Sequence, residues 1–219
     1  MAKETYVYKI FERFWHWSQA FLILFLAVTG FEVHGSFNLL GFEAAVQWHN
    51  IALWALVVLI VFAIFWHFTT GEWRQCIPNT KFIKAQIDYY ITGIFRGAPH
   101  PTKKSVYNKF NPLQRLVYLG LKIFAIPVQI ATGFLYLYYK YPSGSEIQSM
   151  DVINLKVVAI IHTIGAFALV AFVIAHVYLT TTGHKPLSAI KAMITGWEEL
   201  DQEEEANSDV HDRSQSHKE

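Results

Sequence analysis

The stretch that decides the fold is residues 157–183, VVAIIHTIGAFALVAFVIAHVYLTTTG, which contains no Lys, Arg, Asp or Glu. A bilayer core takes about 20 helical residues to cross, and in hydrocarbon every backbone amide must bond within its own segment. The stretch therefore predicts a membrane-spanning helix rather than a buried strand. Its two histidines, His162 and His176, are unusual, because an ionisable side chain inside a span is costly and marks a functional position by default.

Three further stretches have a similar length and apolar character. Of the 219 residues, 53% are apolar and only 16% are charged, against roughly a quarter charged in ordinary soluble domains. This composition argues against a soluble enzyme and predicts an all-α integral membrane protein, a four-transmembrane-helix bundle. The four spans are expected at about residues 15–37, 48–70, 113–138 and 152–181.

The distribution of basic residues predicts the orientation of the chain. The N-terminus and the connection 71–112 are rich in Lys and Arg, whereas the connections 32–47 and 139–156 supply only Lys140 and Lys156. Basic connections stay in the cytoplasm. We therefore expect both termini and the 71–112 loop on the cytoplasmic side of the membrane.

Two segments outside the spans have a character of their own. Within the cytoplasmic loop, Ile83, Ile87, Ile91 and Ile94 recur at helical spacing, which predicts an amphipathic helix on the membrane surface. Residues 198–219 carry nine acidic and two basic side chains, although the whole chain has a net charge of only +1. The sequence thus predicts a membrane domain over 1–197 and a disordered acidic tail over 198–219.

Histidine, not cysteine, is the candidate ligand in this sequence. A single cysteine, Cys76, excludes a disulfide framework, a cysteine-ligated cluster and covalent c-type haem attachment. Ten histidines are present. His162 and His176, 14 residues apart, project from one face of a helix at positions about 21 Å apart along its axis, and His49 and His67, 18 residues apart, also share a face.

Histidines at matching depths on facing helices suit a haem iron, because neutral imidazole is a common axial ligand and two rings fill both axial positions. The sequence offers two such levels and leaves the choice of ligand open at each. The outer level offers His49, His162 and, less well placed, His34; the inner level offers His16, His176 and His67. Gly30, Gly133 and Gly165 would let a flat macrocycle approach the backbone.

Several motifs together resemble a known family. They are Arg13-Phe-Trp-His-Trp17, Trp48-His-Asn50, Tyr107-Asn-Lys-Phe-Asn-Pro-Leu-Gln-Arg115, Ile161-His-Thr-Ile-Gly165 and Ala175-His-Val-Tyr178. In this combination the chain resembles the four-helix dihaem cytochrome b family, which includes the membrane subunit of respiratory formate dehydrogenase and the cytochrome b subunits of nickel–iron hydrogenases and thiosulfate reductases.

The resemblance implies a ligand set and a quinone site. It implies two b haems, an inner one held by His16 and His176 and an outer one held by His49 and His162. Asn111 and Gln114 match an N-x-x-Q pattern that contacts a quinone in formate dehydrogenase-like members. The alternative is that Asn111 simply helps to start the third span.

The function that we expect is electron transfer between a menaquinone or ubiquinone pool and an iron–sulfur or multihaem partner subunit of a respiratory complex. We expect no substrate-specific catalytic site and no nucleic-acid partner. A membrane-bound non-haem iron enzyme is an alternative, but it needs histidines clustered at one level; a transporter is another, but the charge-free spans disfavour it. The sequence leaves open the identity of the partner and the roles of His67 and Lys122.

Overall fold

The computed structural model describes residues 2–77, 82–98, 101–102, 109–140, 152–181 and 187–201. These fall into two compact units, which we describe separately. Unit 1 combines Met1–Ala20, Leu59–Leu119 and Tyr178–Glu219, and unit 2 combines Phe21–Val58 and Gly120–Val177.

Four long apolar helical segments among the described residues confirm the predicted helical architecture. They are α1 (Ile10–Val33), α2 (Phe42–Thr70), a third segment made of α4 (Pro112–Gly120), the π-helical η4 (Leu121–Ala125) and α5 (Ile126–Lys140), and α6 (Val152–Thr180). Each is long and apolar enough to cross a membrane, over Ile10–Val33, Phe42–Thr70, Pro112–Tyr138 and Asn154–Thr180.

The first two spans differ from their predicted limits at the turn between them. Helix α1 ends at Val33 rather than residue 37, and α2 begins at Phe42 rather than residue 48. Gly35 and Gly41 both adopt positive φ, at 82° and 86°, which glycine tolerates without steric cost. The buried carboxylate of Glu32 accepts the backbone N–H groups of Leu39, Leu40 and Gly41 at 2.6 to 2.8 Å, so it fixes this turn.

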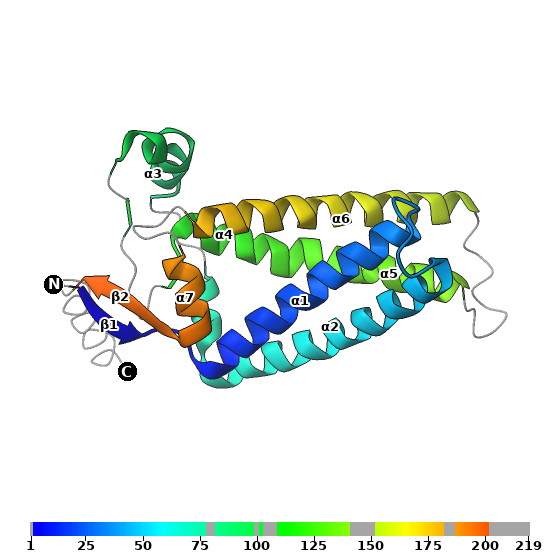
Figure 1. Cartoon of the computed structure of the whole chain (residues 1–219), viewed down its shortest axis with the longest axis horizontal. Coiled ribbons are helices and arrows are strands. Elements are labelled where there is room, and N and C mark those ends of the chain that lie inside the picture. The colour runs from blue at the N-terminus through cyan, green and yellow to red at the C-terminus, as the bar shows by residue number, and fades with distance from the viewer. Residues whose placement is uncertain are drawn as a thin grey trace. The chain divides into compact units, whose positions relative to one another are not determined.

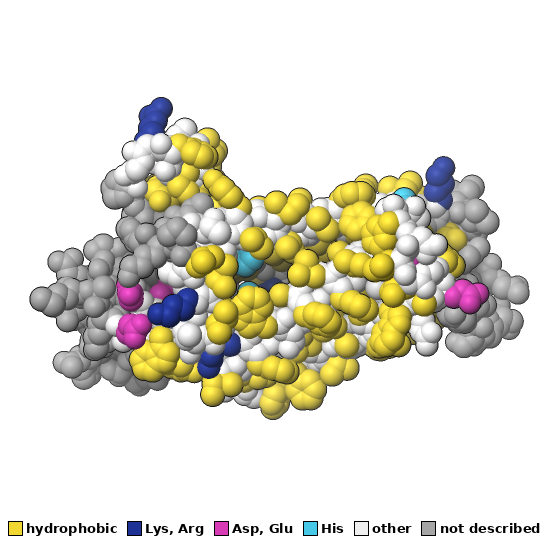
Figure 2. Space-filling model, viewed as in Figure 1, with side chains coloured by type: hydrophobic (Ala, Val, Ile, Leu, Met, Phe, Trp, Pro, Cys, Tyr) yellow, Lys and Arg dark blue, Asp and Glu magenta, His cyan; other side chains and the backbone are white. Residues whose placement is uncertain are grey.

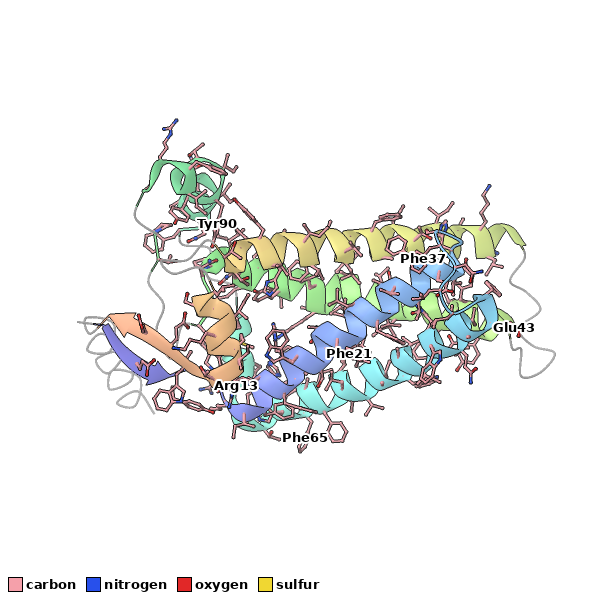
Figure 3. The ribbon with its side chains drawn as sticks, viewed as in Figure 1. Arg13, Phe21, Phe37, Glu43, Phe65 and Tyr90 are labelled. Atoms are coloured by element: carbon pink, nitrogen blue, oxygen red, sulfur yellow. The ribbon has the colours of Figure 1, made fainter. Side chains whose placement is uncertain are left out.

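In unit 2, portions of α1, α2, α5 and α6 pack against one another (Figure 1). Phe31 of α1 meets Phe167 of α6 with ring centroids 5.2 Å apart, and Trp54 of α2 meets Phe134 of α5 at 5.1 Å. Many large apolar side chains point outward, as the yellow surface in Figure 2 shows. Phe21, labelled in Figure 3, is 65% exposed, which suits a surface that faces lipid.

A helical segment of unit 1 lies where the sequence predicts an amphipathic helix in the loop. It consists of α3 (Ile83–Asp88), η2 (Tyr89–Gly93) and the short 3₁₀ turn η3 (Ile94–Arg96). Ile91 and Phe95 are 65% and 75% exposed, whereas the polar Gln86 is fully buried. The helix therefore presents apolar side chains outward and keeps a polar contact inside.

A two-stranded antiparallel sheet in unit 1 was not predicted. Strand β1 (Ala2–Tyr6) pairs with β2 (Trp197–Asp201), with Ala2 opposite Asp201 and Tyr6 opposite Trp197. The Tyr6 and Trp197 rings meet at 5.4 Å. The segment assigned to a tail therefore begins with a strand, while its residues 202–219 lie outside the described residues.

A buried lysine links three segments of unit 1. Lys109, with its side chain only 3% exposed, donates to both carboxylate oxygens of Glu12 at 2.7 and 2.9 Å and lies 3.8 Å from a carboxylate oxygen of Glu72. Lys9 also donates to Glu72, at 2.7 Å, but its side chain is 55% exposed. Because a buried charge is tolerated only when it is paired, Lys109 connects the loop before α4 to α1 and to the segment after α2.

The two lysines give a matched test of this cluster. Lys109→Met leaves Glu12 and Glu72 without their buried counter-charge, so we expect it to lower the free energy of unfolding by about 3 kcal/mol. Lys9→Met removes an exposed ion pair and should cost less than about 1 kcal/mol. Thermal unfolding of the detergent-solubilised variants measures both changes, and equal losses would contradict the assigned role of Lys109.

Candidate functional site

His49 of α2 and His162 of α6 face each other inside unit 2. Their ring centroids are 6.4 Å apart and the ring planes make an angle of 67°. Metal–nitrogen bonds of about 2 Å on both sides, plus half the width of each ring, separate two axial imidazoles by roughly 6 Å. The separation of the rings therefore fits a metal held between the two side chains.

A threonine fixes the orientation of the His49 ring. The Thr29 hydroxyl lies 3.0 Å from Nδ1 of His49 and donates its own proton to the carbonyl oxygen of Phe25 at 2.8 Å. Since a hydroxyl has one proton to give, a Thr29 hydroxyl that donates to Phe25 accepts a hydrogen bond from Nδ1–H of His49. That arrangement places the ring proton on Nδ1 and would leave the lone pair of Nε2 for a metal.

The same arrangement recurs at His162. The Thr132 hydroxyl lies 2.8 Å from Nδ1 of His162 and donates to the carbonyl oxygen of Val128 at 2.8 Å. The side-chain amide nitrogen of Gln129 lies 3.2 Å from Nε2 of the same ring. An amide donor at Nε2 agrees with an unprotonated nitrogen there, which is the state of a ring that ligates through Nε2.

Gln129 lies at the nitrogen of His162 that would bind a metal. Its side-chain oxygen is buried and, among the described residues, has no hydrogen-bond partner. It lies against Gly165, where any Cβ would collide with it. A buried amide with an unsatisfied oxygen is costly, and the Gln129 amide would have to leave Nε2 of His162 for that atom to bind iron.

Two glycines let the histidine rings lie against neighbouring helices. A Cβ on Gly30 would be 3.2 Å from Cε1 of His49, and one on Gly133 would be 3.4 Å from Cε1 of His162. The glycines expected near a haem therefore do line this pair. The donor set, the ring separation and this close backbone approach all fit a bis-histidine haem.

The candidates for the second level occur in both units. In unit 1, His16 meets the Trp17 ring at 5.2 Å, and Nδ1 of His67 lies 2.7 Å from the carbonyl oxygen of Ala63. In unit 2, His176 stacks on Phe172 at 5.6 Å. Because His16 and His176 belong to different units, their pairing stays a prediction. His34 lies just beyond the end of α1.

Asn111 and Gln114 form a capping box at the start of α4. Gln114 N–H donates to Oδ1 of Asn111 at 2.8 Å, and Asn111 N–H donates to Oε1 of Gln114 at 3.0 Å. Pro112 occupies the first helical position, where its missing N–H costs nothing. The alternative role of Asn111 in starting the third span is thus confirmed, and a quinone contact would come in addition to it.

Asn111 also belongs to a buried polar network that the sequence did not reveal. Its side-chain amide donates to the Tyr90 hydroxyl at 3.0 Å, Tyr90 is hydrogen-bonded to Gln86, and Thr102 donates to Gln86 at 3.1 Å. Burial raises the pKa of Tyr90, so this phenol keeps its proton at neutral pH. Gln86 and Tyr90 are four residues apart and are therefore neighbours on one helix face. This spacing is the feature of the sequence that could have indicated the network.

Curated relatives were found along most of the chain. A protein assigned as cytochrome YdhU in Escherichia coli K12 is 30% identical over 210 residues, which cover 90% of this chain and 75% of the relative. A protein assigned as a Ni/Fe-hydrogenase B-type cytochrome subunit in Cupriavidus necator is 29% identical, covering 80% and 78%. A third, assigned as the protein-methionine-sulfoxide reductase subunit YedZ1 in Azospira oryzae, is 24% identical, covering 87% and 98%.

No solved structure matches the chain. The family model described as prokaryotic cytochrome b561 matches residues 7–196, a range that includes the four spans and all six histidines considered as ligands. It confirms the resemblance to the b-type cytochromes of hydrogenases, and it implies that the chain binds haem b. The chain belongs to the prokaryotic cytochrome b561 family.

Proposed function

We propose that this chain is the membrane-anchoring dihaem cytochrome b subunit of a respiratory redox complex, and that it transfers electrons between the quinone pool and a partner subunit. The observation that carries the proposal is the facing pair His49 and His162, each with its Nδ1 bonded to a threonine. Membership of a b-type cytochrome family supplies the cofactor class.

His49 and His162 would hold the outer haem through their Nε2 atoms. The haem supplies reversible one-electron chemistry when it is bound. Two imidazole ligands would leave no position on the iron for oxygen or substrate. The task of the protein is therefore to hold two ring nitrogens in place and to surround them with apolar side chains.

His16 and His176 would hold the inner haem, as the resemblance implies. His162 and His176 lie on one face of α6, about 21 Å apart along its axis, so the helix can serve two haem levels. Two haems at different depths divide the passage across a low-dielectric layer into shorter electron transfers. His67 is the competing inner candidate, since the hydrogen bond of its Nδ1 to Ala63 also leaves Nε2 as an acceptor.

The network around Asn111 supports a quinone site at the cytoplasmic surface. Tyr90 supplies a protonated phenol and Asn111 an amide, and both are donors suited to the carbonyl oxygens of menaquinone or ubiquinone. Gln114 keeps Asn111 in place through the capping box. Proton exchange with the cytoplasm would then accompany electron transfer at this site.

The names of the relatives support a partner subunit. Two of them are described as subunits, one of a Ni/Fe hydrogenase and one of a protein-methionine-sulfoxide reductase. We therefore propose an iron–sulfur or multihaem partner docked on the membrane domain.

The excess of Lys and Arg in the 71–112 loop supports cytoplasmic termini in a bacterial or archaeal inner membrane.

The described residues do not support the two alternatives. Across the described ranges, no three His, Cys, Asp or Glu side chains gather as a metal-ion site, which a non-haem iron enzyme needs. The buried carboxylate of Glu32, the kind of group that a transporter uses, accepts three backbone N–H groups through one oxygen and so serves the turn between α1 and α2.

Removing one ligand tests the two-haem proposal. His162→Ala should abolish the outer haem and spare the inner one, so the reduced α-band should fall to about half of its wild-type amplitude per chain. An optical redox titration should then show one component in place of two. His34→Ala is the matched control and should keep both; an unchanged spectrum in His162→Ala would refute the ligand assignment.

Tyr90→Phe tests the quinone site without disturbing the capping box. Loss of one hydrogen bond to the head group should slow haem reduction by a quinol analogue about tenfold. Reduction by dithionite should be unaffected, because it does not use this site. Tyr138→Phe, which alters an exposed tyrosine, is the control; equal rates in both variants would argue against a quinone site at Tyr90.

A further inference from the structure

Two helical hairpins of unit 2 carry the same short motif. Thr29-Gly30-Phe31 lies on α1, and Thr132-Gly133-Phe134 lies on α5. In each hairpin the next long helix provides the histidine that the motif contacts, His49 on α2 or His162 on α6. The same motif therefore contacts each of the two facing histidines of the site.

The contacts of the two motifs correspond residue by residue. Each threonine binds Nδ1 of its histidine, and each glycine lies beside Cε1 of the same ring. Each phenylalanine packs across to the other hairpin, Phe31 on Phe167 and Phe134 on Trp54. The repeated motif therefore both orients the rings and holds the hairpins together.

We propose that Thr29 and Thr132 are a matched pair of positioning residues that set the tautomer and the electron-donating strength of the two axial ligands of the outer haem, and thereby lower its midpoint potential. This inference rests on the proposed function. It extends that proposal by naming the residues that tune one haem independently of the other.

The physical reason lies in where each hydroxyl proton goes. Each threonine hydroxyl lies 2.8 Å from the carbonyl oxygen four residues earlier, and when its proton is donated there, its oxygen accepts from Nδ1–H of the ring. An accepted Nδ1–H bond makes the imidazole a more basic ligand, and a more basic ligand favours ferric over ferrous iron. Removing the acceptor leaves a buried N–H without that partner and a ring that is less firmly oriented.

An ordinary helical threonine does not account for these contacts. Thr69 of α2 bonds to the carbonyl oxygens of Phe65 and Trp66, and it is exposed. Thr29 is fully buried and Thr132 is 7% exposed. Both add a histidine contact to the same backbone bond, and both precede a glycine that lets the ring come close.

The test is an optical redox titration of the full-length chain in membranes, combined with electron paramagnetic resonance of the oxidised protein. Thr132→Val keeps the shape of the side chain but removes the hydroxyl, so one of the two midpoint potentials should shift upward and one low-spin ferric signal should change. Thr29→Val should affect the same haem. Thr132→Ser should restore the wild-type values, and Thr69→Val should leave both haems unchanged.

The outcomes separate this inference from the proposed function. A wild-type chain without two haems overturns the proposed function. Two haems in the wild type, with potentials and spectra unchanged in both valine variants, overturn only the inference. If Thr132→Val loses haem, retention of haem by Thr132→Ser with the wild-type potential supports the inference, and loss of haem from both overturns it.

Discussion

A histidine buried among apolar helices must satisfy two ring nitrogens with groups that the protein itself provides. In unit 2 a threonine hydroxyl lies within hydrogen-bond distance of Nδ1 of each facing ring, where it can accept the ring N–H and leave the opposite nitrogen as a lone pair. The rings are 6.4 Å apart, and a glycine lies beside each ring. Both features fit a metal held between the two histidines. The proposed electron transfer depends on this arrangement, because it defines where an iron can be held.

In unit 1, the polar side chains pair with one another near the ends of the helices. There the charges and amides lie where loops join the helices: Lys109 pairs with Glu12 and Glu72, and Asn111 starts α4 while it binds Tyr90. These groups satisfy one another and hold the loop segments against the helix ends. A quinone site in this unit would thus use donors that are already oriented by the fold.

The spans were predictable because runs without charge leave few alternatives to a helix, and His162 and His176 were visible as a pair through their spacing. The threonines were not recognised, since a hydroxyl inside a helix usually bonds only to its own backbone, although the repeated Thr-Gly-Phe was present in the sequence. Two features depend on contacts between segments that are distant in the sequence: the pairing of β1 with β2 and the burial of Lys109. A local sequence pattern does not predict such contacts.

The proposed function requires that one chain holds two b haems between histidines of its first, second and fourth spans. Native mass spectrometry of the purified wild-type chain, released gently from detergent, measures this directly. We expect a mass that exceeds that of the polypeptide by two non-covalently bound b haems. A chain that carries one haem or none would contradict it.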